Sequence, residues 1–278
     1  MEPLSHEHFL DNLYSGEIFF EEAGQISNLI VEKTRQSLAK VFPELGDFAK
    51  AQSVVGVGEV QRRTRHLSSK LSRSPNVIRC YTMLLKSLGF NSEKLLMDNP
   101  RLNATPSLAD DVALSRFVYS AHRDTWFAQS QSQINLWIPI FDVDESCSFE
   151  FYRSYFRRPI INTSATFDLR EARLLKEDPG RPHPAPSVQV DETSPLVISA
   201  SAGTCVLFSS SHLHKTRRNT SGRTRFSLEL RFLDAEHRTL GVGAPNVDNL
   251  STGCTADEML PADLYLPSND INSLFLDA

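Results

Sequence analysis

The sequence lacks the features that define several broad classes of protein. It has no run of about 18 apolar residues, so no segment is expected to cross a membrane as a helix. Residues 1–7 contain neither a basic stretch nor an apolar core, so we expect no signal peptide. The four cysteines are widely spaced without a CxxC pair, which argues against a disulfide framework and a thiolate zinc site. These absences predict a cytoplasmic protein with no membrane partner.

An excess of positive charge is also absent. The 278 residues include 29 Lys and Arg and 34 Asp and Glu, for a formal net charge of -5. Nucleic-acid-binding domains are usually basic, so we expect no nucleic-acid partner. Apolar residues at 40% and charged residues at 23% are ordinary for a globular protein. The arginines of 62–65 and 217–218 either form a solvated surface or make an electropositive entrance that attracts anionic substrates.

Helical signals are concentrated in the first third of the chain. Residues 5–50 are expected to be helical, because apolar residues in 26–39 recur at helical spacing. A second helix is expected over 76–89, with Gly89 as its C-terminal stop. Residues 56–58 form a lone GxG motif, for which a loop is expected rather than a nucleotide site.

Strand signals dominate from Arg101 onward, where short runs are bounded by Pro, Asp, Ser and Gly. Helices followed by many short strands predict an α+β, mainly β fold, a sandwich or barrel with the helices packed on one side. We expect a single domain, 1–278, with a helical cover (1–98), a β core (99–235) and a C-terminal tail (236–278) that contains one short helical piece near 256–264. The candidate strands are 101–105, 115–122, 131–139, 147–152, 195–199, 204–209 and 224–233.

Two candidate strands each have one apolar face and one polar face. Side chains alternate between faces along a strand. In 131–139, Gln133 and Asn135 share a face that is opposite to the isoleucines and leucine; in 225–232, Arg225 and Ser227 do the same against Phe and Leu. The polar faces either meet water or line an internal cavity, and the N-terminal helices favour the cavity because they need an apolar sheet face to cover.

The chemistry of the chain begins at His122-Arg123-Asp124. Residues two apart on a strand point the same way, about 7 Å between Cα atoms, so His122 and Asp124 can reach one ion. Imidazole and carboxylate are suitable ligands for iron(II), and two histidines with one carboxylate leave positions open on the metal. The triplet alone is weak evidence, because a histidine and an acidic residue often fall two apart by chance.

A second group of residues follows far downstream. His214 lies 90 residues after Asp124, and Arg225 lies eleven residues after His214. An arginine fork is suited to binding a carboxylate, and Ser227 shares its strand face. Two alternatives stay open at this point. His212 competes with His214 as the third ligand, although the spacing to Arg225 favours His214, and Arg223 competes with Arg225.

Together these motifs resemble the iron(II)/2-oxoglutarate-dependent oxygenases, and within them the phytanoyl-CoA dioxygenase-like branch. The resemblance covers about residues 99–235. It implies a double-stranded β-helix, or jelly-roll, barrel of the cupin-like type, with the N-terminal helices packed on one sheet. The motifs that carry it are His122-Arg123-Asp124, the run from Gly203-Thr204 to Phe208, His214, and Arg225-Phe226-Ser227.

The resemblance implies roles for individual residues. His122, Asp124 and His214 would bind iron(II), and Arg225 would bind the distal carboxylate of 2-oxoglutarate. The further residues expected to contact the cosubstrate are Ser227, Thr216, Gln133 and Asn135.

The same resemblance implies a reaction type. Related halogenases carry Gly or Ala in place of the carboxylate, so Asp124 favours oxidation by O2, most simply hydroxylation, and otherwise desaturation or cyclisation. The expected substrate is a small molecule, in keeping with the specialised metabolism in which this family often works. The alternatives are a non-enzymatic metal-binding jelly roll that senses a ligand, and a metal-dependent cupin isomerase or hydrolase. Neither alternative needs an arginine clamp for 2-oxoglutarate.

Overall fold

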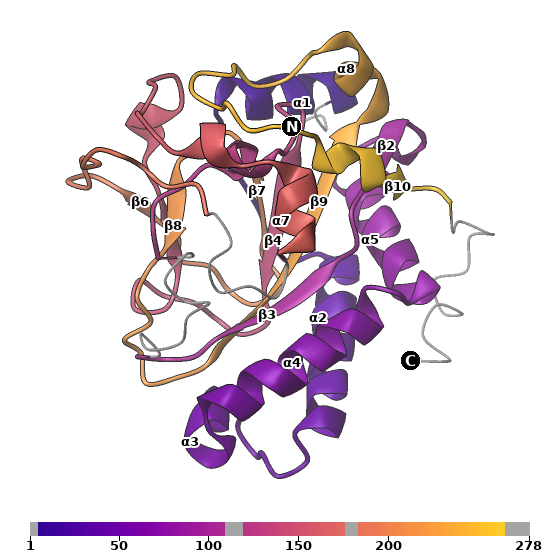
Figure 1. The fold of residues 1–278 in the computed structure, drawn as a ribbon. Helices are drawn as coiled ribbons and strands as arrows, with labels where there is room; N and C mark the ends of the chain where they lie inside the picture. The colour runs from indigo at the N-terminus through magenta and orange to yellow at the C-terminus, as the bar shows by residue number, and fades with distance from the viewer. Residues whose placement is uncertain (1–4, 109–118, 176–182, 265–278) are drawn as a thin grey trace.

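The computed structural model describes residues 5–108, 119–175 and 183–264, whose strands form two antiparallel sheets (Figure 1). The larger sheet has seven strands in the order β1-β7-β4-β9-β2-β10, with β3 also paired to β9, and the smaller sheet has the order β6-β5-β8. The strands of the larger sheet are β1 (Phe19–Glu21), β2 (Leu95–Met97), β3 (Arg101–Thr105), β4 (Ile134–Pro139), β7 (Cys205–Ser209), β9 (Arg225–Asp234) and β10 (Leu260–Pro261). Those of the smaller sheet are β5 (Phe149–Phe151), β6 (Leu196–Val197) and β8 (His214–Thr216).

The N-terminal helices cover one face of the larger sheet. Apolar residues of α1, α2, α4 and α5 form one buried cluster with the apolar face of β4 and β9, which includes Leu136, Ile138, Leu228 and Leu230. Figure 1 shows α2, α4 and α5 stacked on the same side of β9 and β3. The helices are α1 (His6–Ser15), α2 (Gln25–Val41), α3 (Ala51–Val55), α4 (Val57–Leu71), α5 (Pro75–Ser87), α7 (Leu169–Leu174) and α8 (Ala235–Leu240).

Local sequence explains where several of these helices begin and end. The Ser5 hydroxyl accepts a hydrogen bond from the backbone N–H of His8 and caps α1. Pro75 occupies the first turn of α5, and Gly89 follows the helix with a φ of +96°, a left-handed conformation that suits glycine. The helix expected over 76–89 is therefore confirmed.

The mixed α and antiparallel β architecture agrees with the fold class expected from the sequence. The described strands form two open sheets and no closed barrel. Most expected strands are present with shifted ends, whereas the candidate at 115–122 lies partly outside the described residues. Around His122 it contributes an isolated bridge to His214.

Some expectations were wrong. Residues 5–50 are not continuously helical, because β1 lies between α1 and α2 and pairs with β7. The loop expected over 56–58 is correct only at Gly56, since Gly58 lies inside α4. The tail also contains α8 and β10, which the sequence analysis missed.

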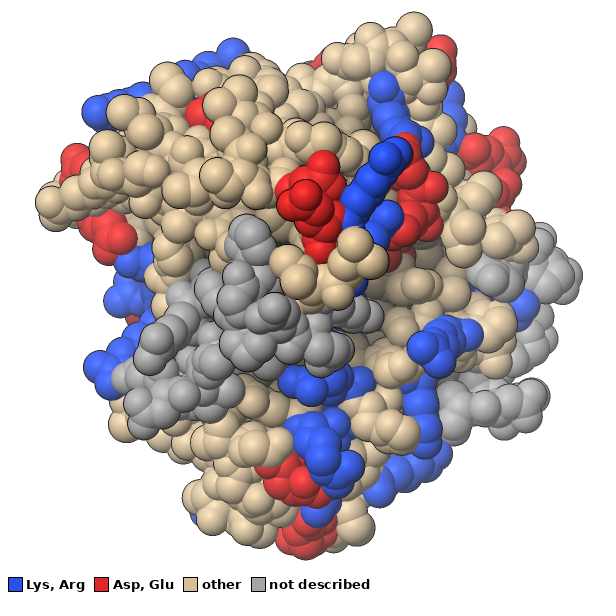
Figure 2. Space-filling model, viewed as in Figure 1, with Lys and Arg blue, Asp and Glu red and all other residues tan. Residues whose placement is uncertain are grey.

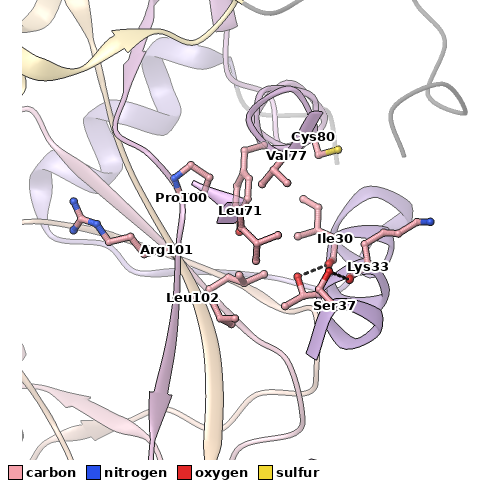
Figure 3. A pocket seen from close by; sticks show the side chains of 12 residues that line it. Ile30, Lys33, Ser37, Leu71, Val77, Cys80, Pro100, Arg101 and Leu102 are labelled. Atoms are coloured by element: carbon pink, nitrogen blue, oxygen red, sulfur yellow. Dashed lines mark hydrogen bonds between the residues drawn. The ribbon is translucent and has the colours of Figure 1, made fainter. Parts of the chain in front are cut away.

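A small apolar crevice lies between α2, α5 and β3, on the helix side of the sheet (Figure 3). Its volume of about 30 Å³ is comparable to one water molecule, so it is too small for an organic substrate. Figure 3 shows Leu102 of β3 beside the crevice and the neighbouring Arg101 side chain directed away from it. The two faces of β3 therefore differ in character, as they do in β4 and β9. None of the described helices is long and apolar enough to cross a membrane.

Candidate metal centre and active-site cavity

His122 and His214 are brought together by backbone pairing. The two residues form an antiparallel bridge in which each backbone N–H donates to the other residue's carbonyl at 2.9 Å. Their ring centroids are 4.6 Å apart. The sequence pattern predicts that Asp124 lies on the same strand as His122. Instead, Asp124 begins a 3-10 helix, Asp124–Phe127. The turn still places its carboxylate beside the two imidazoles.

His122, Asp124 and His214 form a cluster with the composition and spacing of a metal site. One ligand atom from each residue lies within 4.8 Å of the other two, and His122 Nε2 is 3.8 Å from Asp124 Oδ1. The Nδ1 atoms of His122 and His214 each lie 2.9 Å from a backbone carbonyl oxygen. Because a carbonyl only accepts, each Nδ1 carries the proton, which leaves a lone pair on each Nε2. Two imidazoles and one carboxylate fit iron(II) with open positions.

The protonation states at this cluster suit metal binding. Burial, with a contribution from His214, lowers the pKa of His122 to about 4, so its imidazole is neutral near pH 7. Burial opposes ionisation of Asp124, but Arg231, the two histidines and a hydrogen bond from Asn135 outweigh it and lower the pKa of this carboxyl. Metal ligands must be deprotonated, and His122 and Asp124 therefore do not need a large proton release before binding.

Asn135 and Gln133 orient Asp124. The Asn135 Nδ2 donates to Asp124 Oδ2 at 2.6 Å, and Gln133 Nε2 donates to Asn135 Oδ1 at 3.0 Å and also to Gln129 Oε1. Asp124 Oδ2 is thus held while Oδ1 faces His122. Asn135 lines the cavity beside the cluster, whereas Gln133 is fully buried behind it. The contact of these two side chains with a cosubstrate stays a prediction.

The cluster lies in the wall of an internal cavity of about 160 Å³. In the register of β4 and β9, Asn135 is opposite Arg231 and Trp137 is opposite Glu229. All four residues line the cavity, while the apolar face of the same strands packs under the helices. The cavity interpretation of the polar strand faces is therefore confirmed, and the alternative that they meet bulk water is wrong.

Arg225 lines the same cavity with unused hydrogen-bonding capacity. It is 8% exposed, donates to the Cys147 carbonyl at 3.0 Å and to Thr105 Oγ1 at 2.9 Å, and its Nε has no partner among the described residues. The buried Ser227 hydroxyl also has none. Burial lowers the pKa of Arg225 although the Glu229 carboxylate of the same cavity opposes this shift, and no carboxylate of a described residue lies within 4.0 Å of the guanidinium. A buried guanidinium without a paired carboxylate is costly, so a bound anion would stabilise Arg225. Thr216 lies in the wall of the same cavity.

The structure distinguishes the alternatives that the sequence left open. His212 is fully buried, with its ring 4.5 Å from that of Phe156, and it is not part of the cluster. Arg223 is about half exposed and pairs with Asp144 at 3.1 Å. His214 and Arg225 are therefore the members of each pair that reach the cavity.

An ion pair that the sequence did not predict fixes the segment carrying His122 and Asp124. Arg123 lies between them, is 1% exposed and forms an ion pair with Asp248 at 3.1 Å. The Arg123 guanidinium also donates to the carbonyls of Ser211, Tyr155 and Arg158, and Trp126 Nε1 donates to Asp248 at 2.7 Å. No local pattern signals this contact, because the two charges are 125 residues apart.

Comparisons with known proteins identify solved structures with a similar fold. No protein-family model and no curated protein matches the sequence. Among solved structures, EvdO2 from Micromonospora carbonacea var. aurantiaca, complexed with 2-oxoglutarate, matches with a TM-score of 0.50 and 16% identity over 84% of this chain and 91% of that chain. The chain shares the fold of EvdO2. Two further matches are the apo form of the non-heme monooxygenase ThoJ (TM-score 0.48, 15% identity, 81% and 76% covered) and the epimerase SnoN with Fe3+ and alpha ketoglutarate (0.46, 14%, 82% and 84%).

Proposed function

We propose that the protein is a non-haem iron(II)/2-oxoglutarate-dependent oxygenase that oxidises a small molecule. One observation carries this proposal: the cluster of His122, Asp124 and His214 shares a cavity with Arg225, a buried arginine that has no carboxylate partner among the described residues. A metal ligand set and a carboxylate receptor in one cavity fit a cosubstrate that chelates the metal at one end and ends in a carboxylate at the other. The EvdO2 structure, which has the same fold, contains 2-oxoglutarate.

The ligand set would be His122 Nε2, His214 Nε2 and Asp124 Oδ1. Arg225 would bind the distal carboxylate of 2-oxoglutarate through its free Nε, with Ser227 and Thr216 as further donors. Bound iron(II) and 2-oxoglutarate supply the activation of O2, with the overall change of substrate C–H, 2-oxoglutarate and O2 into C–OH, succinate and CO2. Hydroxylation is the simplest outcome, because the intact Asp124 carboxylate occupies the position that a halogenase leaves free.

The residues around the metal ligands contribute positioning and exclusion of water. Asn135 keeps Asp124 in one orientation through its 2.6 Å hydrogen bond. Trp137, Phe149 and Phe208 give the cavity wall an apolar portion, which keeps reactive groups away from bulk water. We further propose that the two open sheets are the halves of a double-stranded β-helix, and that the whole chain is one domain, because β10 of the tail pairs with β2.

The alternatives are less well supported. A ligand sensor or a cupin isomerase has a use for the metal cluster but none for the Arg225 receptor. The test is anaerobic addition of iron(II) and then 2-oxoglutarate to the protein. The proposal predicts a visible metal-to-ligand charge-transfer band that requires both components and is lost in His214→Ala, which removes one of the two imidazole ligands. Absence of the band at saturating concentrations, together with tight zinc binding, would favour the alternatives.

A further inference from the structure

A groove connects the cavity at the metal cluster with the surface between α4 and β3. The groove has a volume of about 740 Å³, and it shares Thr216, Arg225 and Glu229 with the cavity wall. The groove therefore adjoins the cavity whose wall carries the proposed metal ligands. The volume is suited to a drug-sized organic molecule, whose pockets commonly measure about 300–1,000 Å³.

The floor of the groove continues the polar face of β9. In the register of β3 and β9, Arg101 is opposite Glu229, Asn103 is opposite Ser227 and Thr105 is opposite Arg225. Arg101, Asn103 and Thr105 share one face of β3, because side chains alternate along a strand. Figure 3 shows the Arg101 side chain pointing away from the apolar crevice, which agrees with this placement. One polar surface thus runs from β4 across β9 to β3.

The outer wall of the groove is one face of α4. Ser68 fixes this helix against β3, since its hydroxyl accepts a hydrogen bond from the backbone N–H of Leu102 at 2.9 Å. Arg65 lies almost one turn before Ser68, and Arg73 lies just beyond the end of α4; both line the groove. Figure 2 shows Lys and Arg side chains gathered over the region of α4. The wall is therefore positive although the whole chain has a net charge of -5.

Positive charge is in excess along the groove, whose lining contains four arginines and two carboxylates, Asp98 and Glu229. No carboxylate of a described residue lies within 4.0 Å of the guanidinium of Arg65 or Arg73, whereas Arg62 and Arg63 of the same helix pair with Glu59. Arg101 pairs with Asp98, yet the neighbouring Arg231, together with burial, lowers its pKa. The lowered pKa indicates that cationic groups oppose one another here, which an anion would relieve.

We propose that this groove binds an oxyanion group of the substrate, a carboxylate or a phosphate ester, between Arg65 and Arg73 on one side and Arg101 on the other. Guanidinium groups bind both anions in bidentate fashion. The site would hold a polar, negatively charged substrate with its reactive part toward His122, Asp124 and His214. This inference rests on the proposed function for the identity of the reacting end, but the anion site itself needs no metal.

The test measures binding of three matched probes, benzyl phosphate, phenylacetate and benzyl alcohol, by calorimetric titration. The protein is loaded anaerobically with iron(II) and saturating 2-oxoglutarate, which keeps the probes away from Arg225. We expect at least one anion to bind and the alcohol to bind at least about ten-fold more weakly, a difference of about 1.4 kcal/mol. The stronger of the two anions identifies the group, phosphate ester or carboxylate, that the substrate carries.

A double variant, Arg65→Ala/Arg73→Ala, is compared with a control of equal charge change, Arg170→Ala/Arg173→Ala, in α7. We expect the first to lose about ten-fold in anion affinity and the control to stay within about two-fold of wild type, because Arg170 and Arg173 are exposed to screening by salt and do not line the groove. Equal losses in both variants, equal binding of alcohol and anions, or no anion binding up to about 10 mM would overturn the proposal. The two double variants are also compared as metal-free protein, in which Arg225 is open to the probes. A loss of anion affinity confined to Arg65→Ala/Arg73→Ala would then support the groove even if the protein binds no metal, a result that would refute only the oxygenase.

Discussion

The buried ion pair between Arg123 and Asp248 offers the sharpest test of how the metal ligands are held. The side chains of Arg123 and Asp248 are 1% and 5% exposed, so the guanidinium depends on this carboxylate for charge compensation. Asp248→Asn keeps the size of the side chain and an acceptor for Trp126 Nε1, but it removes the charge. Breaking a buried pair by removing one partner typically costs about 3–5 kcal/mol. We expect a value near the lower end, about 3 kcal/mol, because Arg123 keeps its three carbonyl acceptors.

The variant should also affect the metal site. Arg123 lies directly between the two proposed ligands His122 and Asp124 in the sequence. Loss of a residue that orients metal ligands commonly lowers metal affinity by about 10–100-fold. Urea unfolding of the metal-free protein, followed by tryptophan fluorescence, measures the first effect, and a competitive metal titration measures the second. Asp257→Asn is the matched control, since Asp257 pairs with Arg238 but is 66% exposed, and such pairs contribute less than about 1 kcal/mol. Equal stability of the two variants would refute the structural role assigned to Asp248.

Three further predictions follow from the site and its surroundings. His214→Ala should lower iron(II) affinity by more than about 100-fold, beyond the usual effect of residues outside the ligand set. His212→Ala should instead lower stability and leave the iron(II) affinity within about ten-fold of wild type. The reverse result in a metal titration would move the third ligand to His212. Arg225→Ala should raise the 2-oxoglutarate concentration needed for half-saturation by about 100-fold, as expected when one partner of a buried charged contact is removed. The iron affinity should be nearly unchanged. Arg223→Ala is the control, and equal effects of the two variants would contradict the assignment of Arg225. At Asp234, burial opposes ionisation, but the backbone N–H of His237 and the side chain of His6 lower the pKa of the carboxyl from its ordinary 3.8. The carboxylate therefore stabilises the fold above pH 3.8, and this stabilisation is lost as the pH falls through the pKa of Asp234 in the folded protein. Asp234→Asn should therefore be less stable than wild type at pH 7 and approach it in acid unfolding experiments below pH 3.8; a constant difference would contradict this.

Short motifs made the chemical centre predictable from the sequence. His122 and Asp124 are two residues apart, so their Cα atoms lie within about 7 Å of each other in any backbone conformation. The observed 3-10 turn at Asp124 differs from the expected strand, yet the cluster forms. The alternation of β4 and β9 was equally informative, because a strand with one polar face and one apolar face needs two different surroundings.

Other parts of the site left no such pattern. Asp248 belongs to an irregular segment, and its pairing with Arg123 depends on how the tail crosses the protein, which periodicity does not report. Strands of two or three residues, such as β2 and β8, are too short to show alternation. The helix α4 was missed because two glycines mark its start, and because Thr64 occupies a buried position of its inner face.

The conversion of 2-oxoglutarate to succinate tests the central claim most directly. Wild-type protein is incubated with iron(II), ascorbate and 2-oxoglutarate in air, and succinate and CO2 are quantified without any added substrate. We predict slow formation of both products in equal amounts, dependent on iron and O2, and its abolition in His214→Ala. If the wild type binds iron(II) but forms no succinate, with or without a pool of small anionic compounds, the protein is not a 2-oxoglutarate-dependent oxygenase.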